Sequence, residues 1–178
     1  MNRAIFLDRD GVINEAIVVD NKPYPPNTID DVYIFPEMKD MLRMFNKMGY
    51  INIIITNQPD VAKGKQTREN VEAINNIIKW NLSIDDVFTC YHSDEDNCNC
   101  RKPKIGSFLM AKEKYNLDLR KSWMIGDRWS DIEAGYAAGC STIFIDRGYK
   151  EKQSFRNDFC VVDIKEIMEI INANKDLR

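Results

Sequence analysis

Short apolar runs alternate along this chain with longer segments in which apolar side chains recur every three or four residues. The short runs have the length and composition of strands, and they fall at residues 4–7, 51–55, 87–91, 123–125, 142–145 and 159–162. The longer segments predict helices at residues 37–48, 67–82, 106–115, 130–138 and 164–173. Strands that alternate with helices form parallel sheets covered on both faces. We therefore expect a Rossmann-like, three-layer α/β/α sandwich with a mostly parallel sheet.

Individual residues mark where these elements begin and end. Thr67 can cap the second helix with its hydroxyl, and Gly49 and Gly139 are typical helix stops. Ile53–Ile55 is continuously apolar, as expected of a strand with helices on both sides. Residues 23–26, Pro-Tyr-Pro-Pro, predict an extended loop that forms part of the mouth of a site.

The size and composition fit one folded unit. The chain has 178 residues, of which 44% are hydrophobic, enough for a substantial core. It contains no repeat and no linker rich in Gly or Ser, so we predict a single α/β domain over residues 1–178. The formal net charge of −3 argues against a nucleic-acid partner, but a small anionic ligand can still bind in a locally positive pocket.

The sequence also bears on location. Residues 1–8 lead straight into a strand-like run without the apolar stretch of a signal peptide, and no run reaches the ~18 apolar residues of a membrane helix. Three of the five cysteines crowd beside the single histidine, which favours metal binding in a reducing compartment over a disulfide framework. We expect a cytoplasmic protein with no membrane partner and, from its small size, a monomer.

Polar residues follow three of the predicted strands, at the ends where ligands bind in open α/β sheets. They are Asp8, Asp10, Thr56, Asn57, Asp127 and Asp131. Carboxylates held close together repel one another unless a cation neutralises them, so a divalent metal is the natural occupant. Ligands that are all oxygen favour Mg²⁺ over a soft metal.

The segment Asp8-Arg9-Asp10-Gly11 places two carboxylates two residues apart, where they can point to the same side of an extended chain. One carboxylate can attack a phosphorus atom while the other handles the proton of the leaving group. Taken alone, this pattern is equally compatible with a solvated turn.

Four motifs occur in order along the chain. They are Asp8-x-Asp10-Gly11-Val12, Thr56-Asn57-Gln58, Lys102, and Gly126-Asp127-x-x-x-Asp131. This set resembles the haloacid dehalogenase (HAD) superfamily of phosphatases, and the resemblance covers nearly the whole chain. It implies a HAD-like fold and a phosphoric monoester hydrolase, and no inserted run is long enough for a large cap domain.

The resemblance implies a role for each motif residue. Asp8 is the nucleophile that becomes an aspartyl-phosphate, and Asp10 is first the general acid and then the base that activates water. Thr56 and Lys102 hold the transferring phosphoryl group. Asp127 completes the Mg²⁺ site with Asp8 and the backbone carbonyl of Asp10.

Less specific roles are open for several of these residues. Thr56 and Asn57 could serve only as turn formers, and Lys102 could be a solvated surface lysine. Asp131 is expected to orient its loop or cap the following helix rather than to bind the metal.

Cysteine and histidine residues form a second cluster with metal-ligand spacing. The pattern is Cys90-x-His92 followed, after five residues, by Cys98-x-Cys100. Three thiolates and one imidazole make a closed tetrahedral zinc site, so the zinc is expected to be structural. It would hold the loop that delivers Arg101 and Lys102. The alternative is four unrelated residues in an acidic loop.

The two remaining cysteines lie in or beside apolar runs. Cys140 and Cys160 are therefore predicted to be small core residues.

The cysteine cluster, continued by Arg101-Lys102-Pro103, resembles the zinc-bearing branch of the superfamily. That branch contains the D,D-heptose 1,7-bisphosphate phosphatases and the histidinol-phosphate phosphatases. The segment Val61-Ala62-Lys63-Gly64 is closer to the heptose enzymes, although Pro59-Asp60 replaces their Ser-Gly and Lys63 replaces an arginine. The resemblance thus implies removal of the 7-phosphate of D-glycero-D-manno-heptose 1,7-bisphosphate.

The same resemblance extends the expected substrate contacts beyond Thr56, Asn57 and Lys102. Arg101 resembles the arginine of the family that recognises substrate, where it can hold the second phosphate of a bisphosphate. Lys63 keeps a positive charge but loses the planar fork of arginine, and Arg128 is expected near the metal and phosphate. Lys63 and Arg128 could equally be surface charges. Residues 14–19 correspond to the substrate-contacting loop of the family.

Two other functions stay open at this level. One is a phosphatase for histidinol phosphate or another small sugar phosphate. The other is a non-catalytic binding protein on the same fold, with zinc as its main stabiliser. The complete set of motif residues favours an enzyme over a binding protein.

Overall fold

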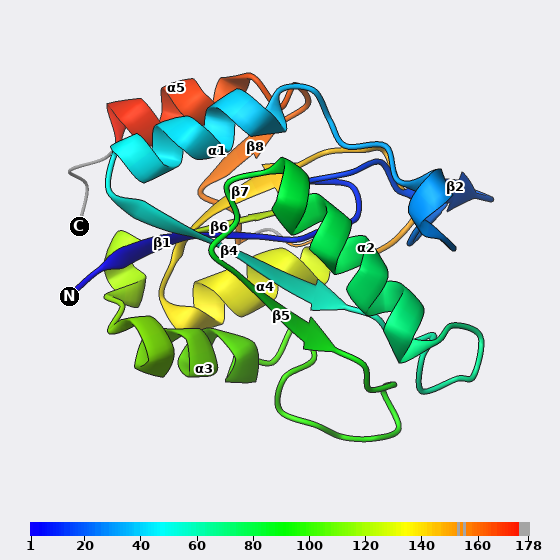
Figure 1. Cartoon of the computed structure of the whole chain (residues 1–178). Coiled ribbons are helices and arrows are strands. Elements are labelled where there is room, and N and C mark those ends of the chain that lie inside the picture. The colour runs from blue at the N-terminus through cyan, green and yellow to red at the C-terminus, as the bar shows by residue number, and fades with distance from the viewer. Residues whose placement is uncertain (153, 155, 175–178) are drawn as a thin grey trace.

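The computed structural model describes residues 1–152, 154 and 156–174, and its centre is a parallel β-sheet. Six strands pair in the order β5-β4-β1-β6-β7-β8 (Figure 1). Their bounds are β1 (Arg3–Leu7), β4 (Tyr50–Asn57), β5 (Asp86–Cys90), β6 (Trp123–Gly126), β7 (Ser141–Ile145) and β8 (Phe159–Val161). Every neighbouring pair is parallel, as the alternation of strands and helices predicts.

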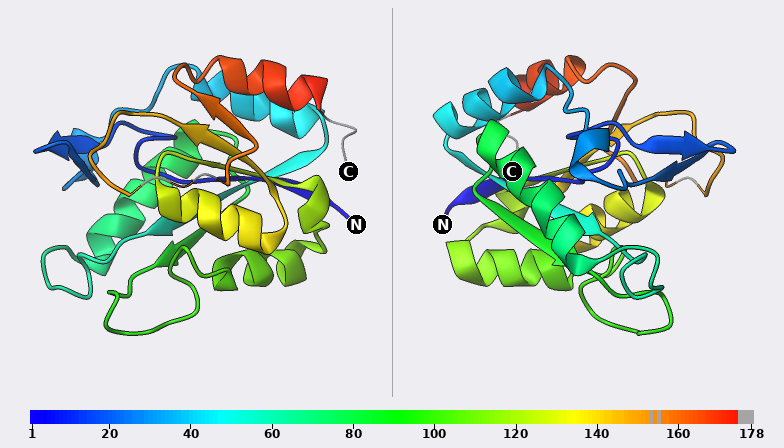
Figure 2. Two further views of the ribbon diagram at one scale, coloured as in Figure 1. Left: turned by 180° about the vertical axis from the view of Figure 1, so that it is seen from behind. Right: turned by 45° about the vertical axis from the view of Figure 1, so that its right-hand side comes forward.

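Helices cover both faces of this sheet, which confirms the three-layer α/β/α fold (Figure 2). Their bounds are α1 (Met38–Lys47), α2 (Arg68–Asn81), α3 (Gly106–Tyr115), α4 (Trp129–Ala138) and α5 (Glu166–Ala173). Buried residues of α1, α2 and α5 join one hydrophobic cluster, and those of α3 and α4 join the other. Short 3₁₀ turns lie at Ile29–Asp31 and Leu119–Lys121.

Strand β1 divides its side chains between the two clusters. Ile5 and Leu7 face the layer of α1, whereas Ala4 and Phe6 face the layer of α3. All four are fully buried, so the strand that precedes the expected nucleophile is packed on both sides. This packing fixes where the residue after β1 is placed.

Helix ends follow the predicted signals with one difference. Thr67 accepts a hydrogen bond from the backbone N–H of Asn70 at the start of α2, and Gly139 ends α4 in the left-handed region at φ +88°. Helix α5 begins two residues after its predicted start. There the Asp163 carboxylate accepts the N–H of Lys165 and holds a turn ahead of the helix.

A small hairpin stands outside the main sheet, where we expected only loops. Strands β2 (Ile17–Val19) and β3 (Lys22–Tyr24) pair antiparallel. The connecting residues Asp20 and Asn21 both have positive φ, at 53° and 60°, as a two-residue hairpin turn requires.

The prediction that Cys160 is a core residue is wrong. Its strand, β8, is at the edge of the sheet, and successive side chains of a strand point to opposite faces. Phe159 and Val161 pack inward, and Cys160 is left exposed. Cys140 is buried, as predicted. Within the described residues, we find no helix long and apolar enough to span a bilayer.

Candidate active site

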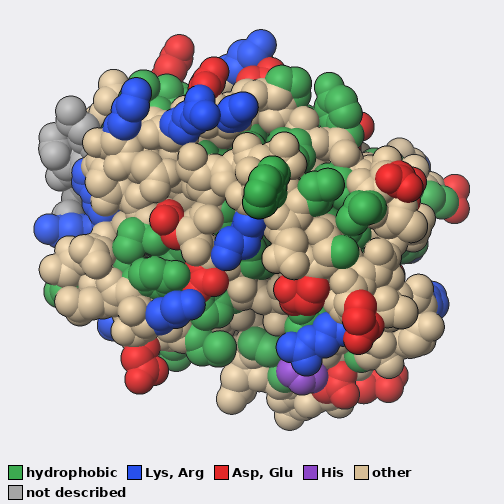
Figure 3. Space-filling view, viewed as in Figure 1, with side chains coloured by type: hydrophobic (Ala, Val, Ile, Leu, Met, Phe, Trp, Pro, Cys, Tyr) green, Lys and Arg blue, Asp and Glu red, His purple; other side chains and the backbone are tan. Residues whose placement is uncertain are grey.

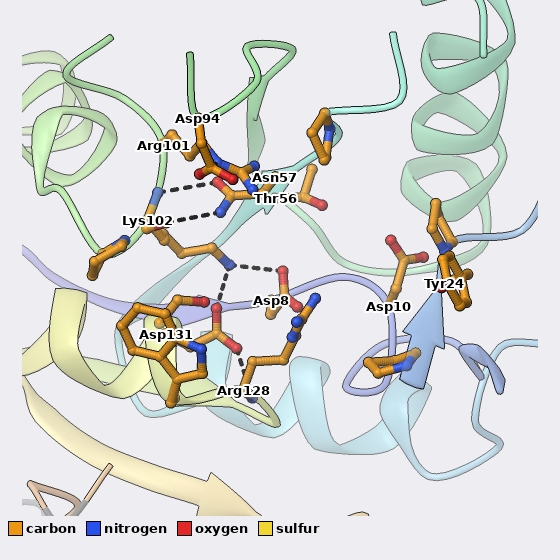
Figure 4. Close-up of a pocket in the computed structure, with 16 residues that line it drawn as sticks. Asp8, Asp10, Tyr24, Thr56, Asn57, Asp94, Arg101, Lys102, Arg128 and Asp131 are labelled. Carbon is orange, nitrogen blue, oxygen red and sulfur yellow. Dashed lines mark hydrogen bonds and ion pairs between the residues drawn. The ribbon is translucent and has the colours of Figure 1, made fainter. Parts of the chain in front are cut away.

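The polar residues of the first, second and fourth motifs meet where β1, β4 and β6 end. Asp8 follows β1, and its backbone N–H donates to the carbonyl of Ile125 in the neighbouring strand β6 at 3.0 Å. Thr56 is near the end of β4, and Asp127 directly follows β6. A pocket of about 290 Å³ opens at this edge, and Asp8, Thr56 and Lys102 line it (Figure 4).

Lys102 reaches into this edge from the loop before α3. Its Nζ donates to Asp8 Oδ1 at 2.7 Å and to the carbonyl of Ile55 at 2.6 Å, and it lies 2.7 Å from Asp131 Oδ1 (Figure 4). Lys102 is buried, so it is not a solvated surface lysine. Burial would lower its pKa, but the carboxylates of Asp131 and Asp8 outweigh burial and raise it.

Three buried carboxylates surround this amine. Oxygens of Asp8, Asp127 and Asp131 lie within 4.8 Å of one another. Burial raises the pKa of Asp8 to about 6 despite the attraction of Lys102, and burial together with Asp8 and Asp131 raises the pKa of Asp127 well above its usual value. One lysine therefore does not balance the negative charge of the cluster.

The cluster fits a hard divalent cation. Both carboxylate oxygens of Asp127 are buried, and neither has a hydrogen bond of regular geometry among the described residues, although the Tyr149 hydroxyl interacts with this carboxylate. A buried carboxylate without well-formed hydrogen bonds is costly, and a bound cation would supply the missing partner. Because the atoms available to bind the metal are all oxygens, Mg²⁺ suits this site better than a soft metal.

Two glycines allow the carboxylates to approach the backbone. A Cβ on Gly11, which has φ +91°, would lie 1.8 Å from Asp127 Oδ2. A Cβ on Gly126 would lie 2.2 Å from the Cβ of Asp131. Both motif glycines are thus required by close approach, and Gly11 is required by its backbone conformation as well.

Asp10 is held by three side chains, none of which was predicted to contact it. Arg9 donates Nε to Oδ1 at 3.1 Å and Nη2 to Oδ2 at 3.0 Å. Asn14 donates to Oδ1 at 3.0 Å, and Gln58 donates to Oδ2 at 2.8 Å. Gln58 belongs to a motif that was recognised, but nothing in the sequence connects Asn14 to Asp10.

Thr56 and Asn57 have different surroundings. Thr56 is buried, and its hydroxyl accepts a hydrogen bond from Gln58 at 2.9 Å. Asn57 forms a reciprocal pair with the backbone of Lys102, accepting its N–H and donating to its carbonyl, both at 3.1 Å. Asn57 thus anchors the lysine loop to β4 while lining the pocket.

Asp131 caps the following helix, in the geometry that we expected. Its Oδ2 accepts the backbone N–H of Arg128 at 3.0 Å, at the start of α4. Its other oxygen contacts Lys102, so one carboxylate both shapes the loop and completes the acidic cluster.

Besides Lys102, three basic residues were expected to contact substrate, and they differ in how they are placed relative to the pocket. Arg101 lines the pocket, and its Nε pairs with Asp94 at 2.7 Å. Its Nη1 is buried and has no partner among the described residues. Arg128 also lines the pocket, but Glu151 holds its guanidinium at 2.5 Å. Lys63 is exposed and is not among the residues that line the pocket.

The mouth of the pocket is formed by residues 23–25, as predicted for the proline-rich segment. The pocket residues do not include 14–19, the segment expected to contact substrate. Three of those residues form strand β2 of the hairpin instead. Asp94 and Trp129 line the pocket without having been predicted.

Cys90, His92, Cys98 and Cys100 converge beside the pocket, and the exposed imidazole is visible at the surface (Figure 3). The sulfur atom of Cys90 lies 3.7 Å from that of Cys98 and 3.2 Å from that of Cys100. His92 Nδ1 lies 3.7 Å and 3.4 Å from Cys90 and Cys100. A tetrahedral zinc with Zn–S bonds of about 2.3 Å separates its sulfur ligands by roughly 3.8 Å. The Cys90–Cys98 separation matches this value and the Cys90–Cys100 separation is shorter, so the four side chains are gathered at about the spacing of a zinc site.

Comparison with known proteins places this chain in a family. The family model described as HAD-hydrolase-like matches residues 99–167. The D-glycero-alpha-D-manno-heptose-1,7-bisphosphate 7-phosphatase of Campylobacter jejuni is 32% identical over 179 residues, which cover 98% of this chain and 96% of that protein. The D-glycero-beta-D-manno-heptose-1,7-bisphosphate 7-phosphatase of Escherichia coli is 34% identical, over 78% of this chain and 76% of that protein.

Solved structures share the fold. The D,D-heptose 1,7-bisphosphate phosphatase of B. bronchiseptica, complexed with magnesium and phosphate, superposes with a TM-score of 0.80. It is 23% identical and covers 97% of this chain and 99% of that one. A putative HAD-like phosphatase from Mesorhizobium loti gives a TM-score of 0.78 at 24% identity, over 99% of this chain and 90% of that one.

Proposed function

This chain belongs to the HAD-like phosphatases, and from that premise we propose that it is a Mg²⁺-dependent phosphomonoester hydrolase acting through an aspartyl-phosphate on Asp8. One observation carries the proposal. The Asp8 carboxylate lies 2.7 Å from the buried Nζ of Lys102 and within 4.8 Å of Asp127 and Asp131. A carboxylate so placed has a cation on one side and an acidic cluster suited to Mg²⁺ on the other.

In the first step an oxygen of Asp8 forms a bond to phosphorus as the bond from phosphorus to the leaving oxygen breaks. Asp10 supplies the proton that the leaving oxygen takes up. Lys102 and the Thr56 hydroxyl stabilise charge on the oxygens of the transferring group. Bound at the Asp8 and Asp127 carboxylates and the Asp10 carbonyl, Mg²⁺ would neutralise charge on the phosphoryl oxygens.

In the second step a water molecule attacks the phosphorus of the aspartyl-phosphate. Asp10, now ionised, takes a proton from that water, and the bond between phosphorus and Asp8 breaks. Inorganic phosphate leaves and Asp8 returns as a carboxylate. Asp10 thus acts once as acid and once as base in each cycle.

We propose D-glycero-D-manno-heptose 1,7-bisphosphate as the substrate, with loss of the 7-phosphate. The names of the two relatives above support this, since both are heptose-1,7-bisphosphate 7-phosphatases. Arg101 supports a substrate with a second anionic group, because its buried Nη1 is unpaired beside the pocket. Arg128 is less available, because Glu151 already neutralises it.

The remaining proposals concern the molecule around the site. Zinc bound by Cys90, His92, Cys98 and Cys100 is structural, because four protein ligands leave no open position. The chain acts as one cytoplasmic, monomeric phosphatase domain over residues 1–178, of which 153, 155 and 175–178 lie outside the described residues.

Replacement of the nucleophile tests the chemistry. Asp8→Asn should lower phosphate release from an aryl phosphate by at least about 10³-fold, because the amide is not a nucleophile at phosphorus. Asp30→Asn, at an exposed position that does not line the pocket, is the control and should leave activity unchanged. Equal activity of Asp8→Asn and the wild-type protein would exclude Asp8 from this role.

A substrate comparison tests the assignment separately. The kcat/KM for heptose 1,7-bisphosphate should exceed that for histidinol phosphate and for heptose 7-phosphate. Arg101→Ala should reduce the preference for the bisphosphate over the monophosphate by roughly tenfold or more, since it removes a charged hydrogen bond. A higher kcat/KM for histidinol phosphate would overturn the heptose assignment while leaving the phosphatase chemistry intact.

A further inference from the structure

Arg9 lies between the two aspartates of the first motif and has no exposed surface. It is the largest of the fully buried side chains in the described chain. A buried guanidinium is costly unless its charge is paired and its N–H groups are bonded. No step of the proposed mechanism uses Arg9, so its burial calls for another explanation.

The contacts of Arg9 point in two directions. On one side its fork donates to both oxygens of Asp10, at 3.1 and 3.0 Å. On the other side Nη1 donates to Asn75 Oδ1 at 2.9 Å, and Asn75 in turn donates to the Thr89 hydroxyl at 3.1 Å. The chain of hydrogen bonds therefore runs from Asp10 through Arg9 to α2 and β5.

This network determines the orientation of Asp10 more firmly than its own loop could. A planar guanidinium that contacts both oxygens fixes the plane of the carboxylate. Asn75 is buried on α2 and Thr89 is on β5, two elements packed into the fold. The position of the guanidinium is thus set by regular structure rather than by the loop that carries it.

We propose that Arg9 and Asn75 are positioning residues that hold the Asp10 carboxylate in the orientation for proton transfer to the leaving oxygen and from the attacking water. The inference rests on the proposed function of Asp10. Proton transfer needs the donor and acceptor atoms within about 2.6–3.2 Å, so a small rotation of the carboxylate slows it. Asn75 acts only through Arg9 and has no contact with substrate in this proposal.

The leaving group gives a readout specific to proton transfer. A nitrophenolate leaves without taking up a proton, whereas an alkoxide needs one from Asp10. Asn75→Ala should therefore lower kcat/KM for an alkyl phosphate by roughly tenfold, a part of the about 10²–10⁴ that a positioned acid contributes. For 4-nitrophenyl phosphate the loss should be under about twofold, because that step does not use the proton.

Asn52→Ala is the matched control. Asn52 is also fully buried, on β4, and donates to the carbonyls of Leu42 and Ser83 at 2.9 Å, remote from the pocket. Both variants lose buried hydrogen bonds and should melt at lower temperature. The ratio of the two kcat/KM values should change only in Asn75→Ala, and an unchanged ratio in that variant overturns the inference.

Two further variants keep the test decisive. If Asn75→Ala does not fold, Thr89→Val removes the partner of Asn75 at nearly constant shape, and it should move the ratio in the same direction. An unchanged ratio in Thr89→Val then overturns the inference. Asp10→Asn separates the two proposals, since an unchanged ratio there would remove Asp10 from acid catalysis. A changed ratio in Asp10→Asn but not in the network variants would refute only the positioning role.

Discussion

At the residue scale, Asp8 is subject to opposing influences. Burial and the neighbouring acids disfavour its charge, while Lys102 favours it, and the balance raises the pKa to about 6. Between about pH 4 and pH 6 the folded protein therefore keeps a proton that the unfolded chain has released. Stability from this residue is present at low pH and is lost as the pH rises through that range.

This balance predicts a pH-dependent effect of Asp8→Asn without divalent cations. As the pH rises from 4 to 7, the free energy of unfolding of the variant should increase relative to that of the wild-type protein by on the order of 2–3 kcal/mol. The reason is that asparagine has no proton to lose. Urea unfolding at several pH values measures the difference.

Asp86→Asn provides a control of opposite sign. Burial opposes ionisation of Asp86, but hydrogen bonds from Lys114, Val87 and Tyr115 lower its pKa. Its stabilising effect is therefore present above about pH 4 and lost at lower pH. As the pH rises through about 4, the free energy of unfolding of the wild-type protein should increase relative to that of Asp86→Asn. If the difference in the free energy of unfolding between Asp8→Asn and the wild-type protein did not change with pH, the raised pKa of Asp8 would be contradicted.

Sequence reasoning found the polar side chains that follow strands, because a motif keeps them at fixed spacing. It missed Arg9 and Asn75, which are 66 residues apart and meet only through tertiary packing. It also missed Asp94, since an exposed acidic residue in a polar loop looks the same whether or not an arginine approaches it. Hydrogen-bond partners of this kind leave no periodicity or spacing to detect.

At the element scale, the cysteine cluster and Lys102 share one loop. Cys98 and Cys100 lie just before Arg101 and Lys102, and Asp94 of the same loop pairs with Arg101. Burial opposes ionisation of Cys98, but the backbone N–H of Arg101 and the neighbouring thiols lower its pKa to about 7. A metal held here would fix both cations at the edge of the pocket.

Loss of one thiol of the cluster should therefore affect substrate binding in the neighbouring pocket as well as zinc binding. Cys100→Ser is expected to reduce bound zinc from one atom per chain to near zero, to lower the melting temperature and to raise KM for the bisphosphate severalfold. Elemental analysis, thermal melting and steady-state kinetics measure the three effects.

Cys160→Ser is the matched variant, because Cys160 is exposed on β8 outside the cluster. It should retain zinc, stability and KM. Zinc content in Cys100→Ser equal to that of the wild-type protein would show that the four residues do not form a zinc site.

Helices α1, α2, α3 and α4 were predicted to within one residue at each end. The hairpin of β2 and β3 was not, because it packs outside the main sheet and its side chains lack the alternation of a half-buried strand. Ile17-Val18-Val19 is a β-branched run, but it is only three residues long and has no polar alternation, and Val18 and Val19 are both exposed. The wrong prediction for Cys160 has a similar cause. An apolar run in the sequence does not reveal that its strand, β8, lies at the edge of the sheet, where one face of the strand is exposed.

At the scale of the whole molecule, the acidic cluster joins segments after two different strands. A cation that binds Asp8 and Asp127 in the folded protein, but not in the unfolded chain, stabilises the fold. At a hundred times its Kd, Mg²⁺ should add about 2.7 kcal/mol to the free energy of unfolding. For a chain of this size that corresponds to a rise in melting temperature of roughly 5–10 °C.

Asp127→Asn should remove most of this rise, because it takes away a carboxylate of the metal site. Asp30→Asn should keep it. Calorimetry with and without Mg²⁺ makes the comparison, and an equal rise in Asp127→Asn would exclude Asp127 as a ligand. The two variants differ from the wild-type protein by one carboxylate each.

The central place of β1 in the sheet has a consequence for biosynthesis. The ribosome makes this strand before the other strands of the sheet, yet its neighbours are β4 and β6, and β6 begins at Trp123. Until β6 has been translated, one edge of β1 has no partner. The nascent chain must therefore carry an open strand that is prone to pairing with other chains. Catalytic competence arises late, when the second neighbour emerges.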